Sequence, residues 1–174
     1  PIQFGTTGDQ PIVGDFNGDG QKDIGVYRPT SGNIFISFTD GGVIGAGAIG
    51  PVGQIGYDPC GLLLIGNLNG DQYEDAVMYR MDGEDNIQWW GLINDGTGFL
   101  DYFNPGTTLV GFGNDNGGDI PFLADINGDG LDDIGVTRGG VTHYVTYTTA
   151  NGGLGINGGG DAIWDFGLAG DVHM

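Results

Sequence analysis

An acidic loop occurs three times in this chain, and the interval between the copies constrains the fold more than any other feature. The copies begin at residues 15, 67 and 125 and read DFNGDGQKD, NLNGDQYED and DINGDGLDD. Side chains that carry oxygen recur at loop positions 1, 3, 5 and 9 in every copy. Repeats of about 50 to 60 residues are typical of supersecondary units such as propeller blades.

The residue types in the loop predict a binding site for a hard cation, and Ca²⁺ fits the spacing best. Positions 1, 3, 5 and 9 would supply side-chain oxygens, and position 7 would supply a backbone carbonyl. The expected ligands are Asp15, Asn17, Asp19, Gln21 and Asp23 in the first loop, Asn67, Asn69, Asp71, Tyr73 and Asp75 in the second, and Asp125, Asn127, Asp129, Leu131 and Asp133 in the third. We therefore expect about three Ca²⁺ sites.

The second loop departs from the other two at two positions. Asn67 replaces the carboxylate at position 1, and Gln72 stands where the others have Gly20 and Gly130. Glycine permits the positive φ of a sharp turn, and fewer carboxylates weaken Ca²⁺ binding. We expect the second site to be the weakest.

Helical calcium modules such as EF-hands and dockerins share the opening of this loop but continue into a helix. Position 12 of an EF-hand loop is a bidentate Glu, whereas Val26, Met78 and Val136 occupy it here. These residues lie in short β-branched or apolar runs that are typical of strands. The loop is therefore predicted to join two strands.

Each unit contains further strand-like runs, and no segment of a dozen residues has helical periodicity. The expected strands are 24–27, 33–38 and 43–49 in the first unit, 76–79, 86–90 and 98–103 in the second, and 134–137, 141–147 and 162–165 in the third. Four short strands per unit predict an all-β, propeller-like fold of antiparallel blades. Within a single repeat domain, 1–174, the blades would span about 1–52, 53–110 and 111–163, and 164–174 would begin a further repeat.

Three of the four basic residues occupy one position of the repeat, thirteen residues after the loop begins: Arg28, Arg80 and Arg138. We interpret them as structural partners of carboxylates in the repeat. Asp9, Asp119 and Asp171 precede or follow the loops at matching places, although Gly61 replaces the acid in the second repeat.

The combined pattern resembles the FG-GAP/VCBS-type repeat of the calcium-binding blades in the integrin α-subunit β-propeller. The resemblance rests on Phe4-Gly5, Gly8-Asp9, Pro11, the loop beginning at Gly14-Asp15 and the run 23–29, with a similar frame from Phe112-Gly113 to Pro121. It implies four-stranded blades with Ca²⁺ between the first two strands. It also implies adhesion or carbohydrate binding more often than catalysis.

The family closes a ring of about seven blades, whereas three units are present here, so the ring is incomplete within one chain. Three blades would leave sheet edges exposed. Phe4-Gly5 recurs as Phe166-Gly167, at the same point of the repeat. We expect either a fragment of a longer chain, or a homo-oligomer or polymer in which copies complete each other as a ring or a filament.

The composition narrows the partners and the location. A formal net charge of −19, with only four basic residues, argues against nucleic-acid binding and against anionic membranes. Cys60 is the only cysteine, which excludes an intrachain disulfide. Weak calcium loops suit millimolar extracellular Ca²⁺, so we expect an extracellular or cell-surface protein. A chain that starts at Pro1 is expected to be processed or excised from something longer.

We predict a non-enzymatic, calcium-binding module with a structural, self-assembling or adhesive role. His143 reads as a structural histidine and Cys60 as a small buried thiol. The alternative is a calcium-dependent lectin, in which Trp89, Trp90, Tyr57 and Tyr102 could stack on a glycan. Trp89 and Trp90 point to opposite sides of one strand, which favours one in the core and one at a blade interface. A third possibility is an accessory domain of a secreted hydrolase.

Overall fold

The fold is all-β over the residues that the computed structural model describes, 4–55, 61–81, 87–97, 108–110, 112–114, 118–149 and 162–165. Twelve strands are the regular elements of these ranges, and no helix occurs in them. The described residues accordingly offer no helix that could cross a membrane. The predicted fold class is confirmed at this level.

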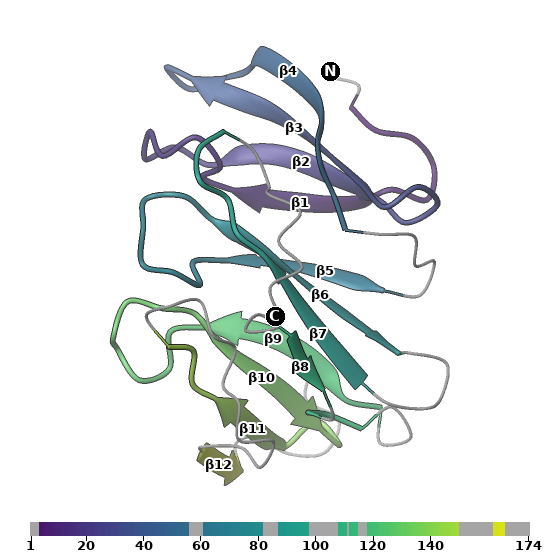
Figure 1. The fold of residues 1–174 in the computed structure, drawn as a ribbon, viewed down its shortest axis with the longest axis vertical. Coiled ribbons are helices and arrows are strands. Elements are labelled where there is room, and N and C mark those ends of the chain that lie inside the picture. Colours follow the sequence, from purple (N-terminus) through teal and green to yellow (C-terminus); the bar gives the residue numbers. More distant parts are fainter. Residues whose placement is uncertain are drawn as a thin grey trace.

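The strands form three four-stranded antiparallel sheets, each in chain order (Figure 1). Sheet 1 contains β1 (Gln10–Gly14), β2 (Asp23–Arg28), β3 (Asn33–Asp40) and β4 (Val43–Gln54). Sheet 2 contains β5 (Leu62–Gly66), β6 (Asp75–Met81), β7 (Ile87–Leu92) and β8 (Thr108–Val110). Sheet 3 contains β9 (Ile120–Ala124), β10 (Asp133–Arg138), β11 (Thr142–Thr146) and β12 (Ala162–Asp165).

The predicted strands agree with these elements except at the fourth strand of each of the first two sheets. β4 continues to Gln54, beyond the end expected for the first unit, and its pairing with β3 contains two register shifts. The strand expected at 98–103 lies outside the described residues, and β8 at Thr108–Val110 is the fourth strand of sheet 2. All three acidic loops join the first two strands of a sheet, as predicted.

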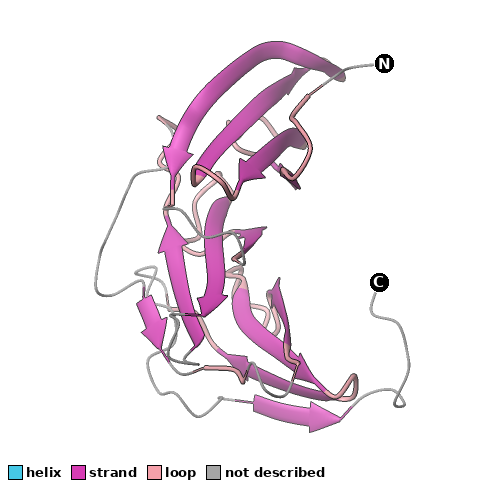
Figure 2. Cartoon of the chain, turned by 90° about the vertical axis from the view of Figure 1, so that its right-hand side faces the viewer, coloured by secondary structure: helices cyan, strands magenta, loops and turns pink. Residues whose placement is uncertain are grey.

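The sheets follow one another along an open arc that one chain does not close (Figure 2). The first strands are neighbours, since β1 contacts β5 and β5 contacts β9. The middle sheet therefore presents one face to the sheet before it and the other face to the sheet after it. We call the corresponding faces of every sheet its preceding face and its following face.

Two apolar layers fill the spaces between the sheets and constitute the core. The layer between sheets 1 and 2 includes Tyr27, Ile34 and Met78, and the layer between sheets 2 and 3 includes Trp89 and Ile134. Trp89 is fully buried in the second layer, whereas the half-buried Trp90 packs against the first. The two tryptophans thus lie on opposite sides of β7, as predicted, with Trp89 in the core and Trp90 at the interface between sheets 1 and 2.

Candidate cation loops and the contacts that hold them

Loop position 1 organises the first and third loops by accepting backbone N–H groups. In loop 1, Asp15 Oδ1 accepts from Gly18 (2.7 Å) and Asp19 (3.2 Å), and Oδ2 accepts from Gly20 (2.7 Å). Asp125 accepts from Gly128, Asp129 and Gly130 in the same way in loop 3. Gly18 and Gly20 have φ values of 74° and 83°, which glycine adopts without strain.

Positions 3 and 5 present further oxygens on the exposed side of the loop. Asn17 Oδ1 accepts the N–H of Asp19 at 3.1 Å, and Asp19 Oδ1 accepts the N–H of Gln21 at 2.8 Å. The same two bonds recur in loop 3, through Asn127 and Asp129. The loop is thus built from side-chain oxygens that curl its own backbone around them.

The second loop closes differently, through the asparagine at its first position. Asn67 Oδ1 accepts from Gly70 (2.7 Å), but its amide nitrogen donates to the Asp71 carbonyl at 2.8 Å. The asparagine has a donor where Asp15 has its second acceptor oxygen. It therefore does not hold the N–H of Gln72 at position 6 as Asp15 holds that of Gly20.

The aspartate at position 9 is buried beneath every loop and accepts hydrogen bonds from two backbone segments. One of its oxygens accepts the N–H of loop position 2, and the other accepts the N–H of a residue at or just after the end of the third strand. The bonds join Asp23 to Phe16 (3.1 Å) and Thr39 (2.7 Å), Asp75 to Leu68 (2.9 Å) and Asn94 (2.8 Å), and Asp133 to Ile126 (3.1 Å) and Thr148 (2.9 Å).

Burial of these carboxyls raises their pKa, most strongly at Asp75, where the pKa reaches about 7. The two amide bonds to each carboxylate oppose that shift. A cation beside the carboxylate would favour its charged form further. Position 9 therefore ties the loop to the third strand whether or not it also binds a metal.

The donor set of the loops fits a hard cation, although their carboxylates do not converge. Within the described ranges, no three His, Cys, Asp or Glu side chains form a group that could hold a metal ion. The oxygens at positions 1, 3 and 5 are of the type that Ca²⁺ prefers, and a carboxylate that accepts amide bonds keeps further lone pairs. At position 7 the side chains have other contacts, since Gln21 Oε1 accepts the N–H of Gly42 at 2.9 Å and the side chain of Leu131 is buried. These contacts leave the predicted ligand at this position, the backbone carbonyl, untested.

Adjacent loops are connected by an acid at position 8, which the sequence analysis missed. Glu74 Oε2 accepts the N–H of Asp15 (2.9 Å), and the N–H of Glu74 donates to the Asp15 carbonyl (2.9 Å). Asp132 makes the same two bonds with Asn67, at 2.8 and 2.7 Å. We call each of these arrangements an inter-sheet clasp.

Each clasp needs a glycine immediately before the preceding loop. A Cβ atom on Gly66 would lie 2.5 Å from Asp132 Oδ2, and one on Gly14 would overlap the carboxylate of Glu74. Both glycines are buried strand residues. The available sequence signal was the pairing of a glycine before one loop with an acid at position 8 of the next.

The repeated arginines are structural, as predicted, and two of the three expected pairs form. Arg28 donates to both carboxylate oxygens of Asp9 at 2.9 and 2.8 Å, and Arg138 does the same to Asp119. The Arg28 guanidinium lowers the pKa of the Asp9 carboxyl. Asp171 lies outside the described residues.

Arg80 has no equivalent acid and uses other partners. Its guanidinium lies 3.6 Å from the centre of the Trp90 ring and donates to Gln88 Oε1, at 3.2 Å from Nη2. Arg28 and Arg138 also lie over aromatic rings, those of Phe35 and Tyr144. The stacking on an aromatic residue, rather than the acid, is therefore common to all three repeats.

Of the four aromatic residues considered for sugar stacking, the two that the structure describes are engaged in contacts within the protein. Trp89 is fully buried and donates its indole N–H to the Phe112 carbonyl at 2.7 Å, so it offers no surface to a ligand. Trp90 lies beneath Arg80. Tyr57 and Tyr102, like Cys60, fall outside the described residues.

His143 has a structural environment. Its ring nitrogen Nδ1 lies 2.9 Å from the hydroxyl of Thr137, and its ring meets that of Phe122 edge to face. These contacts agree with the structural role expected for this histidine.

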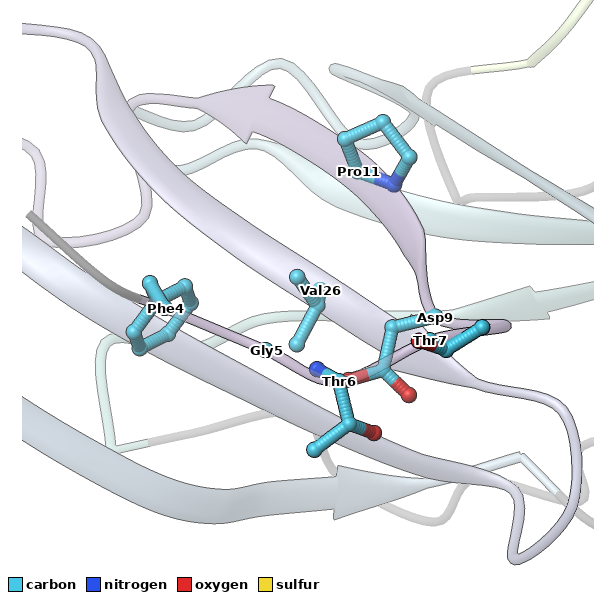
Figure 3. Close-up of a pocket in the computed structure, with 7 residues that line it drawn as sticks. All are labelled: Phe4, Gly5, Thr6, Thr7, Asp9, Pro11 and Val26. Carbon is cyan, nitrogen blue, oxygen red and sulfur yellow. The ribbon is translucent and has the colours of Figure 1, made fainter.

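A cavity of about 520 Å³ lies on the preceding face of sheet 1, beside the Phe-Gly turn (Figure 3). Its lining consists of Phe4, Gly5, Thr6, Thr7, Asp9, Pro11 and Val26. The equivalent of Phe4 in the third repeat is Phe112, which is buried in the layer between sheets 2 and 3. The cavity is thus at a place that an adjacent sheet covers elsewhere in the molecule.

Comparison with known proteins is informative about the fold. No family model matches the chain, and no curated protein matches it. A solved structure of an Agrocybe aegerita lectin, described as recognising non-reducing terminal N-acetylglucosamine, matches with a TM-score of 0.58 and 20% identity. The match covers 92% of this chain and 38% of the lectin chain. At this identity the likeness is evidence for the fold.

Proposed function

We propose that this chain is a calcium-stabilised segment of a β-propeller that binds carbohydrate and has no catalytic activity. The observation that carries the proposal is the likeness to the Agrocybe aegerita lectin, which extends over 92% of the chain. The arrangement of three sheets with their first strands adjacent along an arc supports the propeller part of the proposal.

Calcium would have a structural role in this proposal. The cation would be held by the oxygens at positions 1, 3 and 5 of each loop, with the buried aspartate of position 9 below them. A bound divalent cation reduces the repulsion within a chain whose formal charge is −19. The clasps link neighbouring loops, so the cation would stabilise the sheet junctions as well as the loops themselves. This role suits an extracellular or cell-surface protein.

Terminal N-acetylglucosamine is the first sugar to test, because the lectin with the similar fold recognises it. We expect the chain to bind glycans that end in this sugar on a glycan array in the presence of Ca²⁺, and to bind them less after EDTA treatment. Titration of the ¹⁵N-labelled protein with N-acetylglucosamine, with glucose as the matched control, would locate the site through amide shifts. An array without any bound glycan, at full calcium loading, contradicts the proposal.

A structural or adhesive role is the second candidate, and a specific observation favours it. Both outer faces of the arc leave apolar side chains in solvent, with exposed fractions of 57% at Val13 and 38% at Ile126. An accessory domain of a secreted hydrolase has no comparable feature in its favour. Size measurement with and without Ca²⁺ tests assembly separately from sugar binding.

A further inference from the structure

The three repeats place equivalent residues on equivalent faces, which allows the two outer faces to be compared with the covered ones. Ile65 and Leu123 each lie two residues before a loop begins, and both pack in the apolar layer against the preceding sheet. Val13 is their equivalent in sheet 1 and is 57% exposed. The preceding face of sheet 1 is therefore a surface of the type that the other two sheets bury.

The following face of sheet 3 has the same character. At loop position 2, Phe16 and Leu68 are 3% and 0% exposed because the next sheet covers them, whereas Ile126 is 38% exposed. The residue at position 1 follows this trend: Asp15 and Asn67 are half-buried and Asp125 is exposed. Both outer faces thus retain the apolar residues of a sheet junction without its cover.

The same two faces lack the two halves of the clasp. Position 8 in sheet 1 is Lys22, where the other sheets have an acid, and the position before the loop in sheet 3 is Ala124, where the others have glycine. The Cβ distances at Gly14 and Gly66 indicate that an acid in the place of Glu74 or Asp132 would have to shift if a methyl group stood before the loop. The following face of sheet 3, which has that methyl group, and sheet 1, which has no acid at position 8, are therefore compatible with each other.

We propose that the following face of sheet 3 binds the preceding face of sheet 1 from a second copy of this chain. The junction would bring Lys22 of one copy toward the exposed carboxylates of Asp125 and Asp129 of the other, which gives charge complementarity. Within one chain the Lys22 ammonium instead pairs with Glu74 and is 60% exposed.

The cavity beside Phe4 belongs to this surface. In the repeats that follow another sheet, Ile55 and Phe112 are 5% and 4% exposed at the equivalent place. Phe112 packs on Trp89, with ring centres 6.1 Å apart. Phe4 is half-buried on the uncovered preceding face of sheet 1, and the second copy would cover both Phe4 and the cavity.

Sedimentation velocity of the full chain with Ca²⁺, over a range of protein concentrations, tests the proposal. The wild type is expected to associate, and Lys22→Glu to associate at least about tenfold more weakly, because its carboxylate would meet Ala124. The double variant Lys22→Glu with Ala124→Gly is expected to regain association, since it recreates the clasp of the internal junctions. A monomeric wild type, or a double variant that remains as weak as Lys22→Glu, overturns the proposal.

Two controls separate the junction from other effects. Lys22→Glu also removes the ion pair with Glu74, so a second variant is needed that obstructs the junction from the other side. Ala124→Leu does this on the following face of sheet 3, away from that ion pair. If this variant associates as strongly as the wild type, the proposal is also overturned. The Phe-Gly motif at 166–167 lies outside the described residues, so a chain ending at 165 is measured in parallel. We expect it to associate as the full chain does, and loss of association there would assign the contact to the removed segment instead. The readout is independent of sugar binding.

Discussion

A single methyl group at Gly66 should weaken the junction between sheets 2 and 3. The glycine has no positive φ that alanine would strain, so the substitution acts through space alone. Its Cβ would lie 2.5 Å from Asp132 Oδ2, and the carboxylate must move away from the N–H of Asn67, which it now accepts at 2.8 Å. Gly66→Ala therefore opens one clasp and leaves the loop sequence unchanged.

The magnitude follows from two opposing effects. Leaving a part-buried N–H without its acceptor costs about 1–3 kcal/mol. Replacing glycine by alanine stabilises by about 0.4–1 kcal/mol through the unfolded chain. The midpoints of these two ranges, about 2 and about 0.7 kcal/mol, give a net loss of unfolding free energy of about 1.3 kcal/mol, which for a chain of this length lowers the Tm by roughly 3–5 °C.

Calorimetric unfolding in saturating Ca²⁺ measures this difference directly. Ala124→Gly is the matched control, because it makes the reverse change at the equivalent position where no clasp exists within the chain. We expect it to lower stability by no more than about 1 kcal/mol, through chain entropy alone. A Gly66→Ala protein as stable as the wild type would refute the role assigned to the clasp.

Three further predictions concern the loops and the arginine pairs. Removing Ca²⁺ with EDTA should lower the Tm, and equal melting curves with and without the ion would count against calcium in the loops. Asn67→Asp combined with Gln72→Gly should raise the affinity of the second loop in calorimetric Ca²⁺ titration, because it restores the missing acceptor and the glycine of loop 1; an unchanged isotherm would contradict this. Arg28 lowers the folded-state pKa of Asp9, so the pair stabilises above the unfolded value of about 3.9 and its contribution is lost as the pH falls through the lower folded pKa. Asp9→Asn should therefore be less stable at pH 7 and lose less stability on acidification, as urea unfolding at several pH values would reveal.

The fold was predictable to the extent that it depends on local spacing. Oxygen-bearing residues at fixed intervals, followed by β-branched runs, were enough to predict loops that join strands and sheets of four strands. The pairs of Arg28 with Asp9 and of Arg138 with Asp119 were predictable because the same two residue types recur at one separation in two repeats.

The contacts between repeats were not predictable in the same way. Glu74 and Asp15 are separated by 59 residues in sequence, and neither residue type alone indicates a partner so distant. The role of Asp23 as a buried acceptor of backbone N–H groups was also not predictable, because an aspartate at loop position 9 has the same sequence signature whether it binds a cation or backbone amides. Arg80 differed from the other arginines because Gln88, one strand away, accepts its hydrogen bond in place of the acid that its repeat lacks.

Because the two halves of the clasp are distributed unevenly, the three repeats differ in which neighbouring sheet each can accept. Sheet 2 alone has both the glycine before its loop and the acid at position 8, Gly66 and Glu74. A duplicate of this repeat could therefore succeed its own original and lengthen the arc by one sheet. A duplicate of sheet 1 would bring Lys22 to the glycine, and a duplicate of sheet 3 would press Asp132 against Ala124. Growth of such an array, by engineering or by gene duplication, is thus permitted through its middle member.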